Sequence, residues 1–242
     1  MSVLDLVKAH TPWAIRNVSR SVKRELRWAR NARHPINKVF DEIYQQNKWG
    51  GQRGEFYSGP GSDSDAARLY SEGIKTLIAE QGIRTIVDLG CGDFRVAQQF
   101  LNTQVSYTGV DVVETLIREN MTRYPNINFL CLDIVQDHLP EGDLCLIREV
   151  FQHLSNFEIL KVLPKLSAYE YVVYTDYQPG PGAPCTPNRD ITHGVDTRIW
   201  RDSALFLDQP PFNRRTQQLF EAPAATVLRR PGERIRTYRL WP

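Results

Sequence analysis

Short apolar runs alternate with longer amphipathic stretches through the later part of this chain, from about residue 83 onward. The runs are rich in β-branched residues, as in Ile83 to Val87, which is typical of buried strands. Most of the stretches between them have the spacing of helices. Because strands alternate with helices, we expect a parallel sheet with helices on both faces. The predicted strands are residues 83–88, 106–111, 127–132, 143–148 and 170–176.

Two further apolar runs lie near the C-terminus, at residues 225–228 and 235–240, and Arg230, Pro231 and Gly232 separate them. Proline followed by glycine marks a turn, so the two runs predict a β-hairpin at one edge of the sheet. We therefore predict an α/β fold with a mostly parallel seven-stranded sheet and a C-terminal antiparallel hairpin.

The first 80 residues have a different pattern. Thr11 and Pro12 form a favourable helix start, an N-cap followed by proline at the first helical position. This helix is expected to end between Asn31 and Pro35, with much of its surface basic. Its apolar face comprises Ile15, Val18, Val22, Leu26 and Ala29. The following elements are predicted as a helix at 39–46, a loop at 58–62 and a helix at 63–79.

Charge is distributed unevenly along the 242 residues. Residues 1–38 contain nine lysines and arginines against two acidic residues, a surplus of seven positive charges, while the whole chain carries +2. A basic arm therefore precedes a remainder with a net charge of −5. The length is enough for one α/β domain with a full core and some additional segments.

Several classes of protein are disfavoured. No window approaches the roughly 18 to 20 apolar residues that a membrane-spanning helix needs. Lys8 and His10 interrupt the short apolar stretch at the N-terminus, which argues against a signal peptide. The four cysteines show no CxxC spacing, so we interpret them as reduced structural thiols of a cytoplasmic protein.

The segment around Gly90 carries most of the functional information. A strand ending at Asp88 leads into Gly90 and Gly92, which allow a sharp turn and close approach of a ligand at the carboxyl edge of the sheet. A dinucleotide-binding turn would have a third glycine at position 95, where this chain has arginine. Asp93 puts negative charge where a pyrophosphate would lie, and a P-loop lysine is absent. A cofactor with a ribose but no phosphate fits better: S-adenosylmethionine (SAM).

On these residues the chain resembles the class I SAM-dependent methyltransferases, which have a Rossmann-like fold, from about residue 83 to the C-terminus. The resemblance implies that Asp88, Gly90 and Gly92 hold the methionine part of SAM. It also implies that Asp111 binds the ribose hydroxyls and that Asp133 contacts the adenine amine, since a carboxylate accepts hydrogen bonds from both groups. The other residues of the implied cofactor site are Trp49, Val112, Ile134 and Arg148.

Methyl transfer needs an acceptor held in line and, for a hydroxyl acceptor, a general base. The fourth strand runs into residues 148–154, and in this family the start of that segment faces the methyl group. His153 is the preferred base because an unperturbed imidazole titrates near neutral pH, although it could instead pack or cap. Asp176, at the end of the fifth predicted strand, is a second catalytic candidate or a turn residue.

A loop rich in proline and glycine, residues 178–187, is expected to line the acceptor pocket. The substrate-binding candidates Arg189, Asp190 and Arg198 follow it. An arginine there could hold a phosphate or carboxylate, or could be a solvated surface charge. No tight spacing of acidic residues demands a metal ion, so none is predicted.

The region before the sheet carries a narrower resemblance. Residues 39–44, 47–50 and 58–62 are similar to methyltransferases that occur with bacterial surface-polysaccharide assembly. This implies that the region folds over the cofactor and that Trp49 closes the SAM pocket; a plain core position is the alternative for Trp49. The expected division is a basic arm (1–38), a cofactor-covering helical segment (39–80) and a SAM-binding methyltransferase domain (81–242).

We therefore expect an enzyme that O-methylates a sugar of a surface glycan or glycolipid precursor. Its basic helix would lie on the inner membrane face, or would pack on the domain or on a second subunit. The alternatives are an N-methyltransferase of a small amine and a nucleic-acid methyltransferase that uses the arm on phosphates. Nucleic acid is less favoured because no RNA-binding module is visible. A SAM-binding scaffold without activity would require a closed acceptor pocket.

Overall fold

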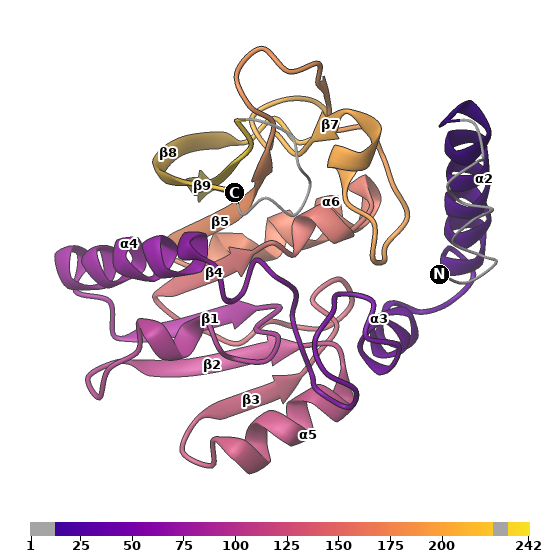
Figure 1. Cartoon of the computed structure of the whole chain (residues 1–242). Coiled ribbons are helices and arrows are strands. Elements are labelled where there is room, and N and C mark those ends of the chain that lie inside the picture. Colours follow the sequence, from indigo (N-terminus) through magenta and orange to yellow (C-terminus); the bar gives the residue numbers. More distant parts are fainter. Residues whose placement is uncertain (1–12, 225–231) are drawn as a thin grey trace.

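A single seven-stranded sheet forms the centre of the computed structural model, which describes residues 13–224 and 232–242 (Figure 1). The predicted helix start at Thr11 and Pro12 and the predicted strand at 225–228 lie outside the described residues. In chain order the strands of the sheet are β1 (Thr85–Leu89), β2 (Ser106–Asp111), β3 (Asn128–Cys131), β4 (Leu144–Arg148), β5 (Tyr171–Gln178), β8 (Arg215–Pro223) and β9 (Arg234–Trp241).

The strands follow the order β3-β2-β1-β4-β5-β9-β8. The strands from β1 to β5 are parallel to one another, and their bounds agree with the predicted ones to within two residues. The last two strands are antiparallel: β9 pairs with β5, and β8 pairs with β9 at the edge. The predicted fold class, a mostly parallel seven-stranded sheet with a C-terminal antiparallel hairpin, is confirmed.

The position of the hairpin differs in part from the prediction. Its second strand, β9, includes the predicted run 235–240, but its first strand is β8, at Arg215–Pro223, instead of 225–228. Most residues of β8 are exposed or half-buried because it is an edge strand, so it lacks the apolar run that marked the others. A short pair of strands, β6 (Thr186–Pro187) and β7 (Ser203–Ala204), has no counterpart in the prediction.

Apolar side chains on the two faces of the sheet form two core clusters. Neighbouring residues of one strand point to opposite faces, so Ile86 joins one cluster and Val87 the other. Burial on both faces explains why the parallel strands are continuous apolar runs in the sequence. The covering elements are α4 (Asp65–Gln81) and α5 (Glu114–Arg123) on one face, and α6 (Asn156–Val162) and the 3₁₀ helix η3 (Leu163–Ala168) on the other.

Two helices precede α4 in the chain: α2 (Trp13–Asn31) and α3 (Ile36–Gln45). Helix α2 ends within the predicted interval and stands at the edge of the molecule (Figure 1). Helix α3 begins three residues before the predicted start because Pro35 has the extended backbone of an N-cap. Its Tyr44 packs with residues at the start of α5. Within the described ranges, no helix has the length and apolar character that crossing a bilayer requires.

Candidate cofactor and acceptor site

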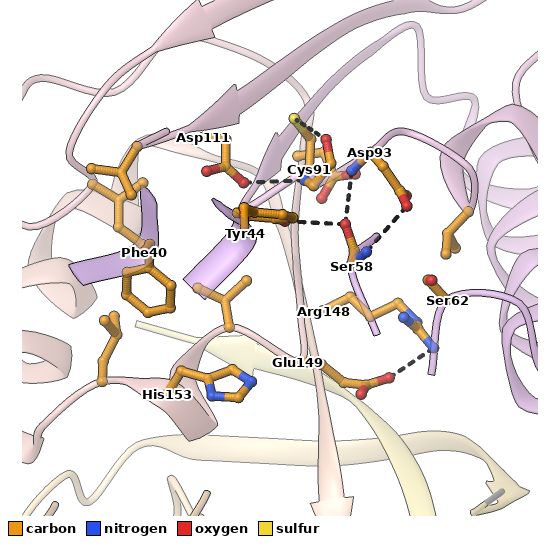
Figure 2. A pocket seen from close by; sticks show the side chains of 18 of the residues that line it. Phe40, Tyr44, Ser58, Ser62, Cys91, Asp93, Asp111, Arg148, Glu149 and His153 are labelled. Atoms are coloured by element: carbon orange, nitrogen blue, oxygen red, sulfur yellow. Dashed lines mark hydrogen bonds and ion pairs between the residues drawn. The ribbon is translucent and has the colours of Figure 1, made fainter. Parts of the chain in front are cut away.

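A pocket opens at the carboxyl ends of β1, β2 and β4, and residues of α3 and of the 49–62 segment line it as well (Figure 2). This edge of an open α/β sheet is the usual place for a ligand. All nine residues expected at the cofactor lie here, together with the expected base. They are Trp49, Asp88, Gly90, Gly92, Asp111, Val112, Asp133, Ile134, Arg148 and His153.

The turn that contains Gly90 and Gly92 lines the pocket, and it also packs closely against other parts of the protein. Gly90 and Gly92 have φ angles of +81° and +55°, in the left-handed region that glycine favours. A Cβ on Gly90 would lie 2.3 Å from Cγ2 of Val150, and one on Gly92 would lie 2.3 Å from Oγ of Ser58. Ser58 belongs to the predicted loop at 58–62. Glycine at position 92 therefore lets this loop, which we call the covering loop, sit directly on the turn.

Asp88 and Asp111 are carboxylates that face the pocket from neighbouring strands. The Tyr107 hydroxyl donates a hydrogen bond to Asp88 over 2.8 Å. The backbone N–H groups of Gly92 and Val113 donate to Asp111 over 3.2 and 3.1 Å. Burial raises the pKa of each carboxyl to about 6, although these hydrogen bonds oppose the change.

The two pocket carboxylates, Asp88 and Asp111, fit SAM as a ligand. Neither Asp88 nor Asp111 has an ion-pair partner among the described residues, so the pocket favours a ligand with positive charge or hydroxyl donors. SAM carries a sulfonium, an ammonium and two ribose hydroxyls. Asp133 lies further along the pocket, where it accepts a hydrogen bond from the Val135 N–H over 2.9 Å and where burial raises its pKa. Apolar side chains beside it, including Val112 and Ile134, suit an adenine ring.

Ser58 fastens the covering loop to the glycine turn (Figure 2). Its Oγ accepts a hydrogen bond from the N–H of Asp93 over 2.8 Å, and its own N–H donates to the Asp93 carboxylate over 3.1 Å. The Tyr44 hydroxyl lies 3.1 Å from the same Oγ. The Arg95 guanidinium lies 2.7 Å from the Asp93 carboxylate. Sequence reasoning missed this set of contacts because a serine in a glycine-rich loop carries no motif.

Arg148 and Glu149 connect the end of β4 to the covering loop. The Nη2 group of Arg148 donates to the Gly61 carbonyl over 2.8 Å and lies 2.8 Å from the Glu149 carboxylate. Glu149 has a φ of +57°, an uncommon backbone conformation for a residue with a side chain, and such residues concentrate at functional sites. Glu149 is therefore a pocket residue that the sequence analysis left without a role.

His153 lies on the side of the pocket away from Asp111 (Figure 2). Its Nδ1 is 3.0 Å from the Gly194 carbonyl oxygen, so in the neutral ring Nδ1 carries the hydrogen and Nε2 is the acceptor. Burial lowers the pKa of His153 to about 4, which keeps the imidazole neutral at pH 7. The rings of Trp49 and Phe40 lie beside it, with centroid distances of 5.5 and 6.4 Å.

Asp176 and Arg198 are placed in the protein interior, and neither lines the pocket. Asp176 is 1% exposed, and burial, followed by the nearby charge of Glu149, raises its pKa well above the usual range. Arg198 is 2% exposed. Its guanidinium donates to the carbonyls of Phe151 and Leu154 over 3.1 and 2.8 Å. Arg198 therefore holds the segment that carries His153 and is not aimed at an acceptor.

Arg189 and Asp190 also lie outside the pocket, as does the expected loop at 178–187. The Asp190 carboxylate accepts a hydrogen bond from the N–H of Asn156 over 2.7 Å, at the start of α6. The Arg189 guanidinium donates to the Arg201 carbonyl over 3.4 Å. The polar groups expected to hold an acceptor thus contact other parts of the chain. Among the described residues, no group of three or more His, Cys, Asp or Glu side chains is arranged to hold a metal ion.

Residues 86–169 match the family model for a methyltransferase domain. This segment contains the glycine turn, the carboxylates of the pocket and His153. The chain contains a methyltransferase domain. No curated protein sequence matches the chain.

Solved methyltransferase structures share its fold over most of the chain. The N-methyltransferase NodS from Bradyrhizobium japonicum WM9, in complex with S-adenosyl-L-homocysteine, has 12% identity and a TM-score of 0.54, covering 85% of this chain and 99% of its own. The 1,6-didemethyltoxoflavin-N1-methyltransferase from Burkholderia thailandensis has 16% identity and a TM-score of 0.52, covering 86% and 88%. Magnesium protoporphyrin IX methyltransferase from Synechocystis PCC 6803 has 13% identity and a TM-score of 0.52, covering 85% and 99%. At these identities the likeness establishes the Rossmann-like class I fold.

Proposed function

We propose that this methyltransferase O-methylates a sugar hydroxyl of a surface glycan or glycolipid precursor, in the cytoplasm. The observation that carries the proposal is the position of the His153 imidazole on the pocket wall, with Nδ1 against the Gly194 carbonyl. A hydroxyl acceptor needs a base that takes its proton as the new bond forms. With the hydrogen on Nδ1, the Nε2 atom of His153 is the nitrogen that receives that proton.

Bound SAM supplies an electrophilic methyl group, and its sulfur keeps the bonding electron pair as the acceptor oxygen forms the new bond to carbon. Asp88 and Asp111 bind the positively charged and hydroxyl-bearing parts of such a cofactor. The contact between Ser58 and Asp93 holds the covering loop over the pocket, which excludes water from the reacting groups. His153 takes the hydroxyl proton, and Gly194 fixes the orientation of its ring.

The aromatic residues beside His153 support a sugar as the acceptor. Phe40 and Trp49 form an apolar wall next to the proposed base, and aromatic faces pack well against the C–H groups of a sugar ring. Glu149 offers carboxylate oxygens to the remaining hydroxyls from another wall. The resemblance of residues 39–44, 47–50 and 58–62 to methyltransferases that occur with surface-polysaccharide assembly directs the proposal to glycans of that kind.

The test is transfer of a labelled methyl group from SAM into a fractionated cell extract by the full chain. We expect label in a nuclease-resistant glycan or glycolipid fraction. The Asp88→Ala variant provides the blank because it removes a cofactor carboxylate. The His153→Gln variant should retain SAM binding but transfer little label.

Label confined to small amines or to RNA would overturn the sugar proposal. Label in a glycan that His153→Gln leaves unchanged would keep the acceptor but remove His153 as the base. Absence of transfer together with normal SAM binding would favour a binding protein without activity.

A further inference from the structure

Helix α2 faces the rest of the protein with its polar edge. The Arg27 guanidinium contacts both carboxylate oxygens of Asp196 over 2.6 Å, and the Trp28 indole N–H donates to the same carboxylate over 2.9 Å. Asn31, at the end of the helix, donates to the His193 carbonyl over 2.9 Å. Trp28 and Asn31 are buried by these contacts. The side of the helix opposite this edge therefore faces away from the domain.

The apolar stripe predicted from the sequence lies on that outer side as far as its side chains are described. Val22 is 52% exposed and Leu26 is 67% exposed, and Ala29 is exposed as well. Their spacing places them on one face of the helix. The alternative in which this stripe packs on the domain is therefore not met by Val22, Leu26 and Ala29. Two large apolar side chains exposed on adjacent turns of one helix indicate a surface that binds something else.

The basic residues around the apolar stripe of α2 indicate what binds there. Residues 1–38 carry a surplus of seven positive charges, and Lys23 is exposed between Val22 and Leu26. Glu25 is the one acidic residue within α2. An apolar stripe flanked by basic residues matches the interface of a membrane with anionic lipids, where acyl chains accept the stripe and phosphates attract the charges.

A second copy of the chain fits this face less well. Two such helices face to face would bring two strongly basic arms together, and like charges repel. Two large side chains from each copy would also bury far less than the roughly 1,000 Å² of a specific interface.

We propose that helix α2 binds the surface of an anionic lipid membrane, with Val22 and Leu26 inserted into the interface. The loop that holds α2 also reaches the pocket, since Asp196 contacts Arg27 while Gly194 contacts His153. Membrane binding would thus place the pocket close to the bilayer. The consequence that the acceptor is carried on a lipid rests on the proposed function, whereas membrane binding itself does not.

The test is sedimentation of the full chain with vesicles of phosphatidylcholine, with and without phosphatidylglycerol. We expect binding to the anionic vesicles, weakening as salt is added because salt screens the charges. Serine at both positions, Val22→Ser with Leu26→Ser, should weaken binding about tenfold because the inserted apolar area is lost. Met121→Ser, a change of a 46% exposed apolar residue on α5, is the matched control and should bind as the unchanged chain does.

Equal binding to neutral and anionic vesicles, or unchanged binding by the double serine variant, would overturn the proposal. A concentration-dependent dimer in sedimentation velocity that the double variant abolishes would identify a second copy as the occupant instead. Normal SAM binding by the variant confirms that the domain is folded. Because vesicle binding is measured without acceptor, its failure is distinguishable from failure of the sugar proposal.

Discussion

Asp88 and Asp111 occupy the ends of adjacent strands in the part of the pocket that we propose holds the cofactor, which we call the cofactor half. His153 lies in the part proposed for the acceptor, the acceptor half, and contacts a loop that lies 41 residues further along the chain. The sheet register fixes the two carboxylates, because β1 and β2 pair along five residues. The orientation of the imidazole depends on contacts with a distant loop, including the hydrogen bond to the Gly194 carbonyl oxygen. The cofactor half should therefore resist changes in distant loops, and the acceptor half should respond to them.

The largest expected effect is at the proposed base. His153→Ala should lower kcat by about 10²- to 10⁴-fold, because loss of a positioned general base costs that much. The cofactor carboxylates are untouched, so the dissociation constant of SAM should stay unchanged. Single-turnover kinetics with isothermal titration of SAM checks both expectations.

The pH profile gives a second measure of the same residue. Burial lowers the pKa of His153 to about 4, so the base is lost only as the pH falls through about 4. An acid limb of kcat near 6.5 would show that the ring is more solvated than its packing against Trp49 indicates.

In the cofactor half, Gly92→Ala should weaken SAM binding by about ten- to a hundredfold. The added Cβ would lie 2.3 Å from Ser58 Oγ, which displaces the covering loop, and a left-handed backbone costs about 1–3 kcal/mol with a side chain. Gly182→Ala is the matched control, since Gly182 has a φ of +75° and no atom within 4 Å of an added Cβ. Equal losses of SAM binding in the two variants would assign the effect to general destabilisation of the fold and not to displacement of the covering loop.

The pKa of Asp111 makes the cofactor half sensitive to mild acid. Its folded pKa of about 6 lies above the value of an unfolded chain, so the folded apo protein binds more protons between about pH 4 and 6. The free energy of unfolding should therefore fall by about 2 kcal/mol as the pH rises through this window. If the ionised Asp111 carboxylate binds SAM as we propose, SAM binding should strengthen over the same interval. Asp111→Asn should reduce the slope of the stability profile measured by thermal unfolding by the part that Asp111 contributes, and Asp88, whose pKa is also raised to about 6, should keep a slope of its own.

The smallest effect tests the link between α2 and the acceptor half. Asp196→Asn weakens the ion pair with Arg27 and so loosens the loop whose Gly194 orients His153. We expect kcat to fall a few-fold, about threefold to tenfold, with SAM binding unchanged, because a misplaced base lowers only the chemical step. Glu42→Gln removes a similar ion pair, with Arg30, and serves as the control. Equal losses in both variants would argue against a specific route through residues 194–196.

The same difference between the halves explains what the sequence could predict. Each cofactor carboxylate follows an apolar run, and the topology of a parallel sheet brings the ends of such runs to one edge. Asp133, after β3, illustrates this: the family resemblance implied its role, and the position of β3 in the sheet brings it to the pocket.

Contacts between distant segments could not be predicted in this way. Ser58 meets Asp93 across 35 residues, and Asn31 meets His193 across 162. Arg198 looked like an acceptor-binding arginine because its sequence context is a loop, yet its burial depends on carbonyl groups of a segment more than forty residues earlier. Strand β8 was not predicted, because an exposed edge strand needs no apolar run.

The separation of 169 residues between Arg27 and Asp196 has a consequence for biosynthesis. Arg27 of helix α2 leaves the ribosome 169 residues before Asp196 in its docking loop. At about 5–20 residues per second, the helix waits roughly ten to thirty seconds for Asp196. During that interval the Trp28 edge is uncovered together with Val22 and Leu26. The nascent chain therefore displays a longer apolar surface than the finished enzyme, which gives membranes and chaperones their earliest access to it.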